Sequence, residues 1–178
     1  MDLYLFTSER LGFRDWKASD LEAFANMNAD PHVMQHFPHT LSVEESENAL
    51  TGYQEHFQQR GYTYFVVETL KSAEFIGFIG LKYQDFEAPY TPAVDIGWRL
   101  LREFWGQGYA TEGARRCLEY AFNTLGLDRV ISHCPAVNTP SERVMQKIGM
   151  VRKGEFHHPL LEGYPELNPC VWYEIKKS

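Results

Sequence analysis

Between residues 93 and 126, an extended segment, a turn with two glycines and a long helical pattern follow one another. Ala93–Leu101 reads as a strand because it is mostly apolar and bounded by loop residues. Gly106 and Gly108 stand in the turn, where the lack of a side chain lets the backbone approach a ligand closely. The helix after them turns its unpaired N–H groups and its positive dipole end toward the same place. The segment therefore predicts a cradle for a pyrophosphate, with a tight turn that binds nothing as the alternative.

The helix is predicted from apolar residues that recur at steps of three and four after Ala110. These positions are Ala114, Cys117, Leu118, Ala121, Phe122 and Leu125. They form one face of an amphipathic helix, which Gly126 closes. Spacing excludes two other phosphate sites: a dinucleotide fingerprint would need a third glycine at Thr111, and the Gly-Lys-Ser/Thr of a P-loop is absent.

Local signals elsewhere predict alternating strands and helices in a single domain over residues 1–178. The predicted strands are Leu3–Phe6 or Leu11–Arg14, then Tyr62–Leu70, Phe75–Lys82, Arg129–Cys134, Val151–Phe156 and Val171–Lys176. Helix starts are predicted at Ser19 with Glu22, at Ser42 with Glu45, and at Thr139, each with a capping-box pattern. The order predicts an α/β fold with a mixed sheet and not a repeating βαβ array.

Composition limits the function classes. The chain carries 17 basic and 24 acidic residues, a net charge of -7, so duplex nucleic acid is not expected as its partner. An acidic surface suits a cationic substrate such as an amine. No apolar run approaches the ~20 residues of a membrane span, and the N-terminus lacks the features of a signal peptide. We expect a cytoplasmic protein.

No metal site is predicted. Cys117, Cys134 and Cys170 have no metal-ligand spacing, and their odd number argues against a disulfide framework. The adjacent His157 and His158 would point to opposite sides of an extended segment, so they would not share one ion.

A second cluster, Asn138-Thr139-Pro140-Ser141 followed by Gly149-Met150, lies one strand and one helix after the glycine turn. Together the two stretches resemble the acetyl-coenzyme A motifs of the GNAT superfamily of N-acyltransferases. The first resembles the pattern Q/R-x-x-G-x-G/A over Trp105–Ala110, with Trp in the leading position. The second resembles N-x-x-S/A followed by G-F/M. Near the N-terminus, Thr7–Leu11 and Asn28–Pro31 also resemble the RimJ/RimL-like subgroup, so the likeness spans nearly the whole chain.

The resemblance implies an α+β fold of three layers, in which helices flank a mixed, mostly antiparallel central sheet. It also implies acetyl-CoA as co-substrate, with no metal. The implied coenzyme site consists of Trp98, Arg99, Leu100, Trp105, Gly106, Gln107, Gly108, Tyr109, Ala110, Thr111, Asn138, Ser141 and Met145. Amides of the 106–111 loop would bind the pyrophosphate, and the main chain of residues 98–100 would pair with the pantetheine arm as an added strand would.

The implied chemistry is direct attack by an amine in a ternary complex. Asp95 is the expected base, since burial in an apolar strand would raise its pKa; a solvated or merely structural Asp95 is the alternative. The oxyanion donor is expected to be the N–H of Trp98 or Leu100. Many family members place a Tyr acid seven residues after the motif Asn, where this chain has Met145, so Ser141 is the expected acid, with solvent or another Tyr as alternatives.

The acceptor is expected to be a small-molecule or peptide amine, in a pocket formed by Phe37, Tyr83 and Phe86, although core packing explains these aromatics as well. Monomer and homodimer both remain open. Two other function classes also remain: a coenzyme A-binding sensor or scaffold with little or no catalysis, and a nucleotide-phosphate binder unrelated to acyl transfer.

Overall fold

The computed structural model describes residues 3–178 and contains one mixed sheet of eight strands in that range. They are β1 (Phe6–Thr7), β2 (Leu11–Arg14), β3 (Tyr64–Thr69), β4 (Phe75–Gln84), β5 (Ala93–Leu100), β6 (Arg129–Pro135), β7 (Val151–Phe156) and β8 (Cys170–Lys176). Their spatial order is β1-β2-β3-β4-β5-β6-β8-β7. Every neighbouring pair is antiparallel except β5 and β6, which are parallel. The predicted mixed, mostly antiparallel sheet is confirmed.

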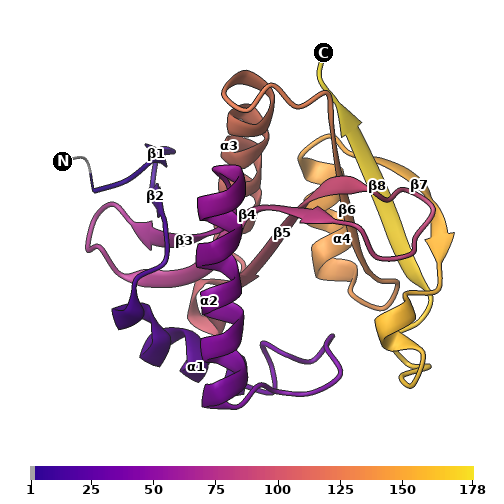
Figure 1. The fold of residues 1–178 in the computed structure, drawn as a ribbon, viewed down its shortest axis with the longest axis horizontal. Helices are drawn as coiled ribbons and strands as arrows, with labels where there is room; N and C mark the ends of the chain where they lie inside the picture. Colours follow the sequence, from indigo (N-terminus) through magenta and orange to yellow (C-terminus); the bar gives the residue numbers. More distant parts are fainter. Residues whose placement is uncertain (1–2) are drawn as a thin grey trace.

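The helices cover both faces of this sheet. They are α1 (Leu21–Ala29), α2 (Val43–Arg60), α3 (Tyr109–Asn123) and α4 (Thr139–Lys147), with short 3₁₀ turns at η1 (Ala18–Asp20), η2 (Arg102–Phe104) and η3 (Pro159–Leu161). Figure 1 shows α2 in front of the central strands and α3 behind them. None of the helices between residues 3 and 178 is long and apolar enough to cross a membrane.

The helix ends follow the predicted signals in part. Ser42 and Glu45 form the predicted capping box of α2, and Gly61 ends that helix with a left-handed backbone at φ +76°. The box predicted at Ser19 is wrong, because the Asp20 carboxylate accepts from the Lys17 amide instead and α1 begins one residue later. The cap of α4 is Asn138 rather than Thr139.

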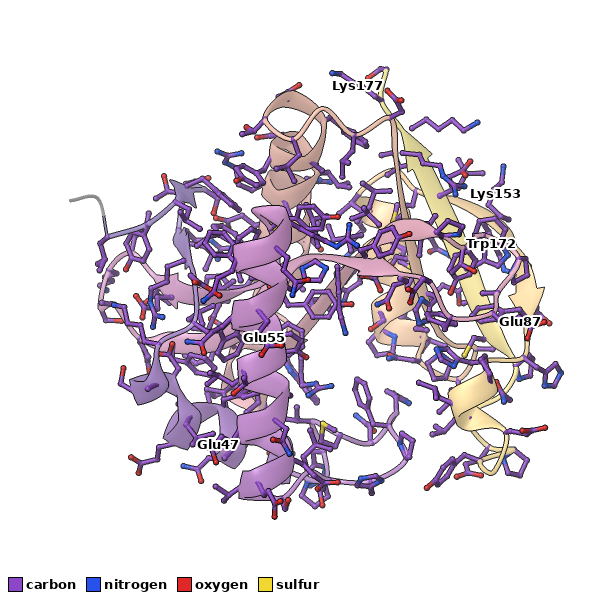
Figure 2. All side chains as sticks on the ribbon, viewed as in Figure 1. Glu47, Glu55, Glu87, Lys153, Trp172 and Lys177 are labelled. Atoms are coloured by element: carbon purple, nitrogen blue, oxygen red, sulfur yellow. The ribbon has the colours of Figure 1, made fainter. Side chains whose placement is uncertain are left out.

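Separate hydrophobic cores fill the two sides of the sheet. Apolar residues of α3, such as Ala114, Cys117 and Ala121, are buried against β3, β4 and β5. On the other side, Phe24 of α1 and Leu50 of α2 pack against Val66 and Phe78, while α2 keeps charged residues such as Glu47 and Glu55, labelled in Figure 2, exposed. The sheet therefore stands between two packed layers, and both layers contribute to the site described below.

A buried ion cluster joins the N-terminal segment to the sheet. Arg14 on β2 donates to both carboxylate oxygens of Asp20 at 2.8 Å and also pairs with Glu68 on β3. The side chains of all three residues are nearly excluded from solvent. Because a carboxylate left unpaired in such a place keeps its desolvation cost, the cluster depends on Arg14.

We expect Arg14→Met to lower the free energy of unfolding by about 3–5 kcal/mol, since two buried carboxylates lose their partner. Urea unfolding at neutral pH measures this. The matched control is Arg152→Met, which removes an exposed pair with Glu155 and is expected to cost less than about 1 kcal/mol. Equal losses in the two variants would contradict the assignment of the cluster to stability.

Candidate coenzyme and acceptor site

A cavity of about 750 Å³ opens where β5 and β6 separate. Within residues 3–178, the two parallel strands are paired only at Asp95 and Ile131, and the residues that follow on both strands line the cavity. Residues of β5, the glycine turn, α4 and the connection between α1 and α2 line the cavity. The sheet therefore has an internal edge, against which an extended ligand can lie.

The glycine turn presents free amides to this cavity. Gly106 and Gly108 have left-handed backbones, with φ of +71° and +82°. Glu112 is the first residue of the turn and helix start whose amide is bonded, to the carbonyl of Gly108. Within residues 3–178, the N–H groups from Gly106 to Thr111 make no hydrogen bond to protein. They have the arrangement expected of an anion site at a helix N-terminus.

Contacts from the N-terminal segment hold the turn in place. Arg10 donates from Nη1 to the carbonyl of Gln107 at 3.1 Å and from Nε to Glu112 at 2.6 Å. Its guanidinium carbon also lies 4.2 Å from the centre of the Tyr109 ring. Ser8 donates to the same Glu112 carboxylate at 2.6 Å. Because these contacts fix the turn without using its amides, the amides stay available to a ligand.

Strand alternation decides which β5 amides face the gap. Leu101 donates to Ile76 of β4, so residues of the same parity direct their main-chain groups to β4. The intervening residues direct theirs to β6, and accordingly the carbonyls of Ile96 and Leu100 accept from Ser132 Oγ and Trp105 Nε1. The N–H groups of Trp98 and Leu100 therefore face the gap, and their role as oxyanion donors stays a prediction.

Asp95 is buried at the base of the cavity, where only 4% of its surface is exposed. The Tyr64 hydroxyl donates to its carboxylate at 2.8 Å, and Gln84 Nε2 donates at 3.0 Å. Burial raises the pKa of Asp95 to about 6, against these two hydrogen bonds and the charge of Lys82, which lower it. A carboxyl with such a pKa is ionised at neutral pH and can accept a proton.

The first motif contributes most of its predicted residues to the cavity. Its lining includes Trp98, Arg99, Leu100, Trp105, Gly106, Gly108, Tyr109, Ala110 and Thr111. Gln107 is outside the lining, because its side chain donates to the carbonyl of Glu103.

The second motif lies on the opposite wall. Asn138, Ser141 and Met145 all line the cavity, and Asn138 Oδ1 accepts from the Ser141 amide at 3.2 Å. This bond explains why Asn138 stands at the start of α4, and it leaves the Ser141 hydroxyl free of any hydrogen bond to the described residues.

Two of the three aromatic residues predicted for the acceptor pocket lie elsewhere. Phe37 lines the cavity, whereas Tyr83 and Phe86 do not. Tyr83 lies under the Arg60 guanidinium, 3.9 Å from ring centre to Cζ, at the end of α2. Phe86 stacks on His158 with ring centres 4.5 Å apart. Both rings are held by packing, which was the alternative explanation.

The structure adds lining residues that the motifs do not indicate. These are Tyr53 of α2, Tyr64 of β3, His133 of β6, and Arg143 and Lys147 of α4. Burial lowers the pKa of His133 to about 3, so this ring is neutral. The sequence does not indicate Tyr53 and Tyr64, because a tyrosine on a strand or helix carries no signal that distinguishes a pocket position from a core position.

Metal chemistry finds no support in the arrangement of ligands. Within residues 3–178, no three His, Cys, Asp or Glu side chains are grouped so that they could hold an ion.

A family profile described as "Acetyltransferase (GNAT) domain" matches residues 10–151. The chain belongs to the GNAT acetyltransferase family. It is 31% identical over 159 residues to the "uncharacterized N-acetyltransferase YnaD" of Bacillus subtilis, with 88% of each chain covered. It is also similar to the crystal structure of a GNAT-family acetyltransferase from Bacillus anthracis, at 30% identity, 96% coverage of each chain and a TM-score of 0.80.

A further solved structure is similar in fold at lower identity. It is RimL, described as a ribosomal L7/L12 alpha-N-protein acetyltransferase in complex with coenzyme A, at 20% identity, 97% coverage of each chain and a TM-score of 0.76. The predicted family is thus confirmed. Met145, the residue at the position where an acid was expected from the resemblance, is 1% exposed and belongs to the main core.

Proposed function

We propose that the chain transfers an acetyl group from acetyl-CoA to a primary amine by direct attack in a ternary complex. The observation that carries the proposal is the juxtaposition of a buried carboxylate with free amides along one gap in the sheet. Asp95 stands at the point where β5 and β6 part, and the unbonded amides of residues 106–111 lie at the other end of β5.

The residues present fit coenzyme A. The free amides of the turn suit a pyrophosphate, and a Cβ added at Gly106 would meet nothing within 4 Å, so the space above the turn is open. Arg143 and Lys147 bring positive charge to the same side of the cavity, which suits further phosphate. The N–H groups of Trp98 and Leu100 can pair with an extended amide-containing arm as a sheet edge does.

Acetyl-CoA supplies the activated acyl group as a thioester. The chain's own residues then deprotonate the acceptor amine and stabilise the charges that develop during the transfer. Asp95 takes the proton of the incoming ammonium, because an amine with a pKa near ~10.4 is not nucleophilic at neutral pH. The N–H of Trp98 or Leu100 stabilises negative charge on the acyl oxygen. As the new C–N bond forms and the C–S bond breaks, the Ser141 hydroxyl, free on the cavity wall, passes its proton to the leaving sulfur and takes the second proton of the attacking nitrogen, so that it ends unchanged.

A mechanism through an acyl-cysteine intermediate is disfavoured because the cysteine thiols are protonated. Cys134 and Cys170 line the cavity, but both are buried. Burial raises the pKa of Cys134 to about 12 and that of Cys170 to about 11. Since the thiolate is the nucleophile, neither residue is activated at neutral pH. Direct attack by the amine follows as the simpler route.

A coenzyme A-binding sensor is the second candidate, and the buried Met145 favours it because this side chain cannot donate a proton. The two candidates share the binding site and differ only in turnover.

A thiol-release assay with acetyl-CoA and a panel of primary amines separates them. We expect amine-dependent thiol release, with the acetylated amine identified by mass spectrometry. Coenzyme A binding measured by calorimetry without release from any amine would favour the sensor. Thermal stabilisation by ATP or NAD, but not by coenzyme A, would refute both and favour a nucleotide binder.

A further inference from the structure

Arg99 reaches from β5 into the cavity on the side of α1 and α2. Its Nη1 donates to Asn28 Oδ1 at 2.7 Å. The guanidinium carbon lies 4.2 Å from the centre of the Phe37 ring and 5.2 Å from that of Phe78. Its Nε is buried and has no hydrogen-bond partner within residues 3–178. Nη2 makes no hydrogen bond to the described residues and is not among the fully buried unpaired atoms, so it is the guanidinium nitrogen from which a ligand carboxylate can accept a charge-assisted hydrogen bond.

Arg99 also lacks a counter-ion. It forms no ion pair in the part of the chain that the structure describes, whereas the buried Arg14 pairs with two carboxylates. Burial lowers the pKa of Arg99. Arg99 is half-buried, and a guanidinium partly withdrawn from water without an anion is unfavourable, so such a group is retained where a ligand supplies the anion.

The charges of the cavity lining also favour an anionic ligand at Arg99. Among the described residues that line the cavity, Asp95 is the one carboxylate, and Arg99, Arg143 and Lys147 are also present. The cavity is therefore more basic than the chain as a whole, with its net charge of -7. Arg143 and Lys147 belong to α4 on the coenzyme side, so Arg99 is left as the cation of the acceptor side.

Asp95 and Arg99 lie at opposite ends of the stacked rings of Tyr64 and Phe78. The Tyr64 hydroxyl bonds Asp95, the Tyr64 ring stacks on Phe78 with centres 5.3 Å apart, and Arg99 lies over Phe78. An acceptor that reaches both ends needs several bonds between its amine and its anion, more than an α-amino acid has between its amine and carboxylate.

We propose that Arg99 binds a carboxylate of the acceptor, and that the acceptor is a small amino acid whose reactive amine is separated from this carboxylate by several methylenes. This names the substrate class of the acetyl transfer proposed above and rests on it. Arg99 acts as a specificity residue, while the amine is placed at Asp95.

The test compares 5-aminopentanoate with pentylamine, which lacks the carboxylate, and with 1,5-diaminopentane, which replaces it by a second cation. We expect kcat/KM for 5-aminopentanoate to exceed that for either amine by about tenfold or more, as one charge-assisted hydrogen bond allows. Arg99→Met should abolish this preference by raising KM for 5-aminopentanoate alone. Arg99→Lys should restore part of the preference for the carboxylate, since an ammonium keeps the positive charge but lacks the planar donor group of arginine.

The control is Arg143→Met, which removes a lining cation on the coenzyme side. It should weaken coenzyme A binding and leave the preference for the carboxylate intact. If Arg99 only holds Asn28 and Phe37 in place, Arg99→Met would instead lower activity toward all three acceptors alike, and the proposal would be wrong.

Binding gives a readout that does not depend on turnover. We expect calorimetric titration of 5-aminopentanoate into the protein saturated with coenzyme A to show binding that Arg99→Met weakens at least tenfold. Carboxylate binding without acetylation of any amine would uphold the Arg99 site while the proposed transfer fails. Acetylation of amines with no carboxylate preference, or titrations that Arg99→Met leaves unchanged, would overturn the Arg99 site while the transfer stands.

Discussion

Asp95→Asn is expected to lower kcat/KM for an amine by roughly 10²- to 10⁴-fold at pH 7–8, the usual contribution of a positioned base. The pKa of Asp95 is raised to about 6, so the wild-type carboxylate is ionised above that pH and protonated below it. The loss should therefore shrink as the pH falls through 6. It should shrink again toward the amine's own pKa near ~10.4, where solvent already supplies the free amine. A pH–rate profile of both proteins measures this.

The matched control is Asp15→Asn. Asp15 is also a partly buried carboxyl whose pKa is raised by burial, but it does not line the cavity. This variant should keep the wild-type profile, and coenzyme A affinity should be unchanged in both. A variant of Asp95 that retains an acid limb near pH 6 would show that another group titrates, and Asp95 would then be a structural partner of Tyr64.

The parts of the site that sequence could predict are those encoded by near neighbours. The left-handed turn at Gly106 and Gly108 needs residues without a side chain, and the helix after it is fixed by its own apolar repeat. The capping box of Ser42 with Glu45 likewise acts within one turn. Each of these signals lies inside a few residues of sequence, so the fold around the amide cradle was accessible before the structure.

The rest depends on distant residues. Tyr64 reaches Asp95 from 31 positions away, and only the pairing of β3, β4 and β5 brings the two together. Residue type alone likewise could not separate Phe37, which lines the cavity, from Tyr83, which packs under Arg60. The box predicted at Ser19 was wrong for a reason closer in sequence: the Asp20 carboxylate accepts from the Lys17 amide and pairs with Arg14 six positions earlier, and these contacts outweigh a cap at Ser19.

Gly108→Trp is expected to weaken coenzyme A binding by roughly 100-fold or more. An indole at this position would stand over the amides of the turn, and losing even two hydrogen bonds to a charged group costs about 3 kcal/mol or more. The fold should survive, because an added Cβ would meet only Arg10 Nη2, at 3.5 Å, and the strain of a side chain at φ +82° is about 1–3 kcal/mol. Calorimetry with coenzyme A measures the affinity, and thermal unfolding measures the fold.

Gly61→Trp is the control that distinguishes the effect of backbone strain from the effect of blocking the coenzyme site. Gly61 has nearly the same backbone, φ +76°, also adjoins a helix end, and an added Cβ there would meet nothing within 4 Å. It does not line the cavity, so the variant should lose similar stability and keep its affinity for coenzyme A. If both tryptophan variants bound coenzyme A equally well, the free amides of the turn would not be the pyrophosphate site. The proposal that this gap in the sheet receives acetyl-CoA would then have to be given up, because the other described helix start that lines the cavity, that of α4, has its amides bonded to Val137 and Asn138.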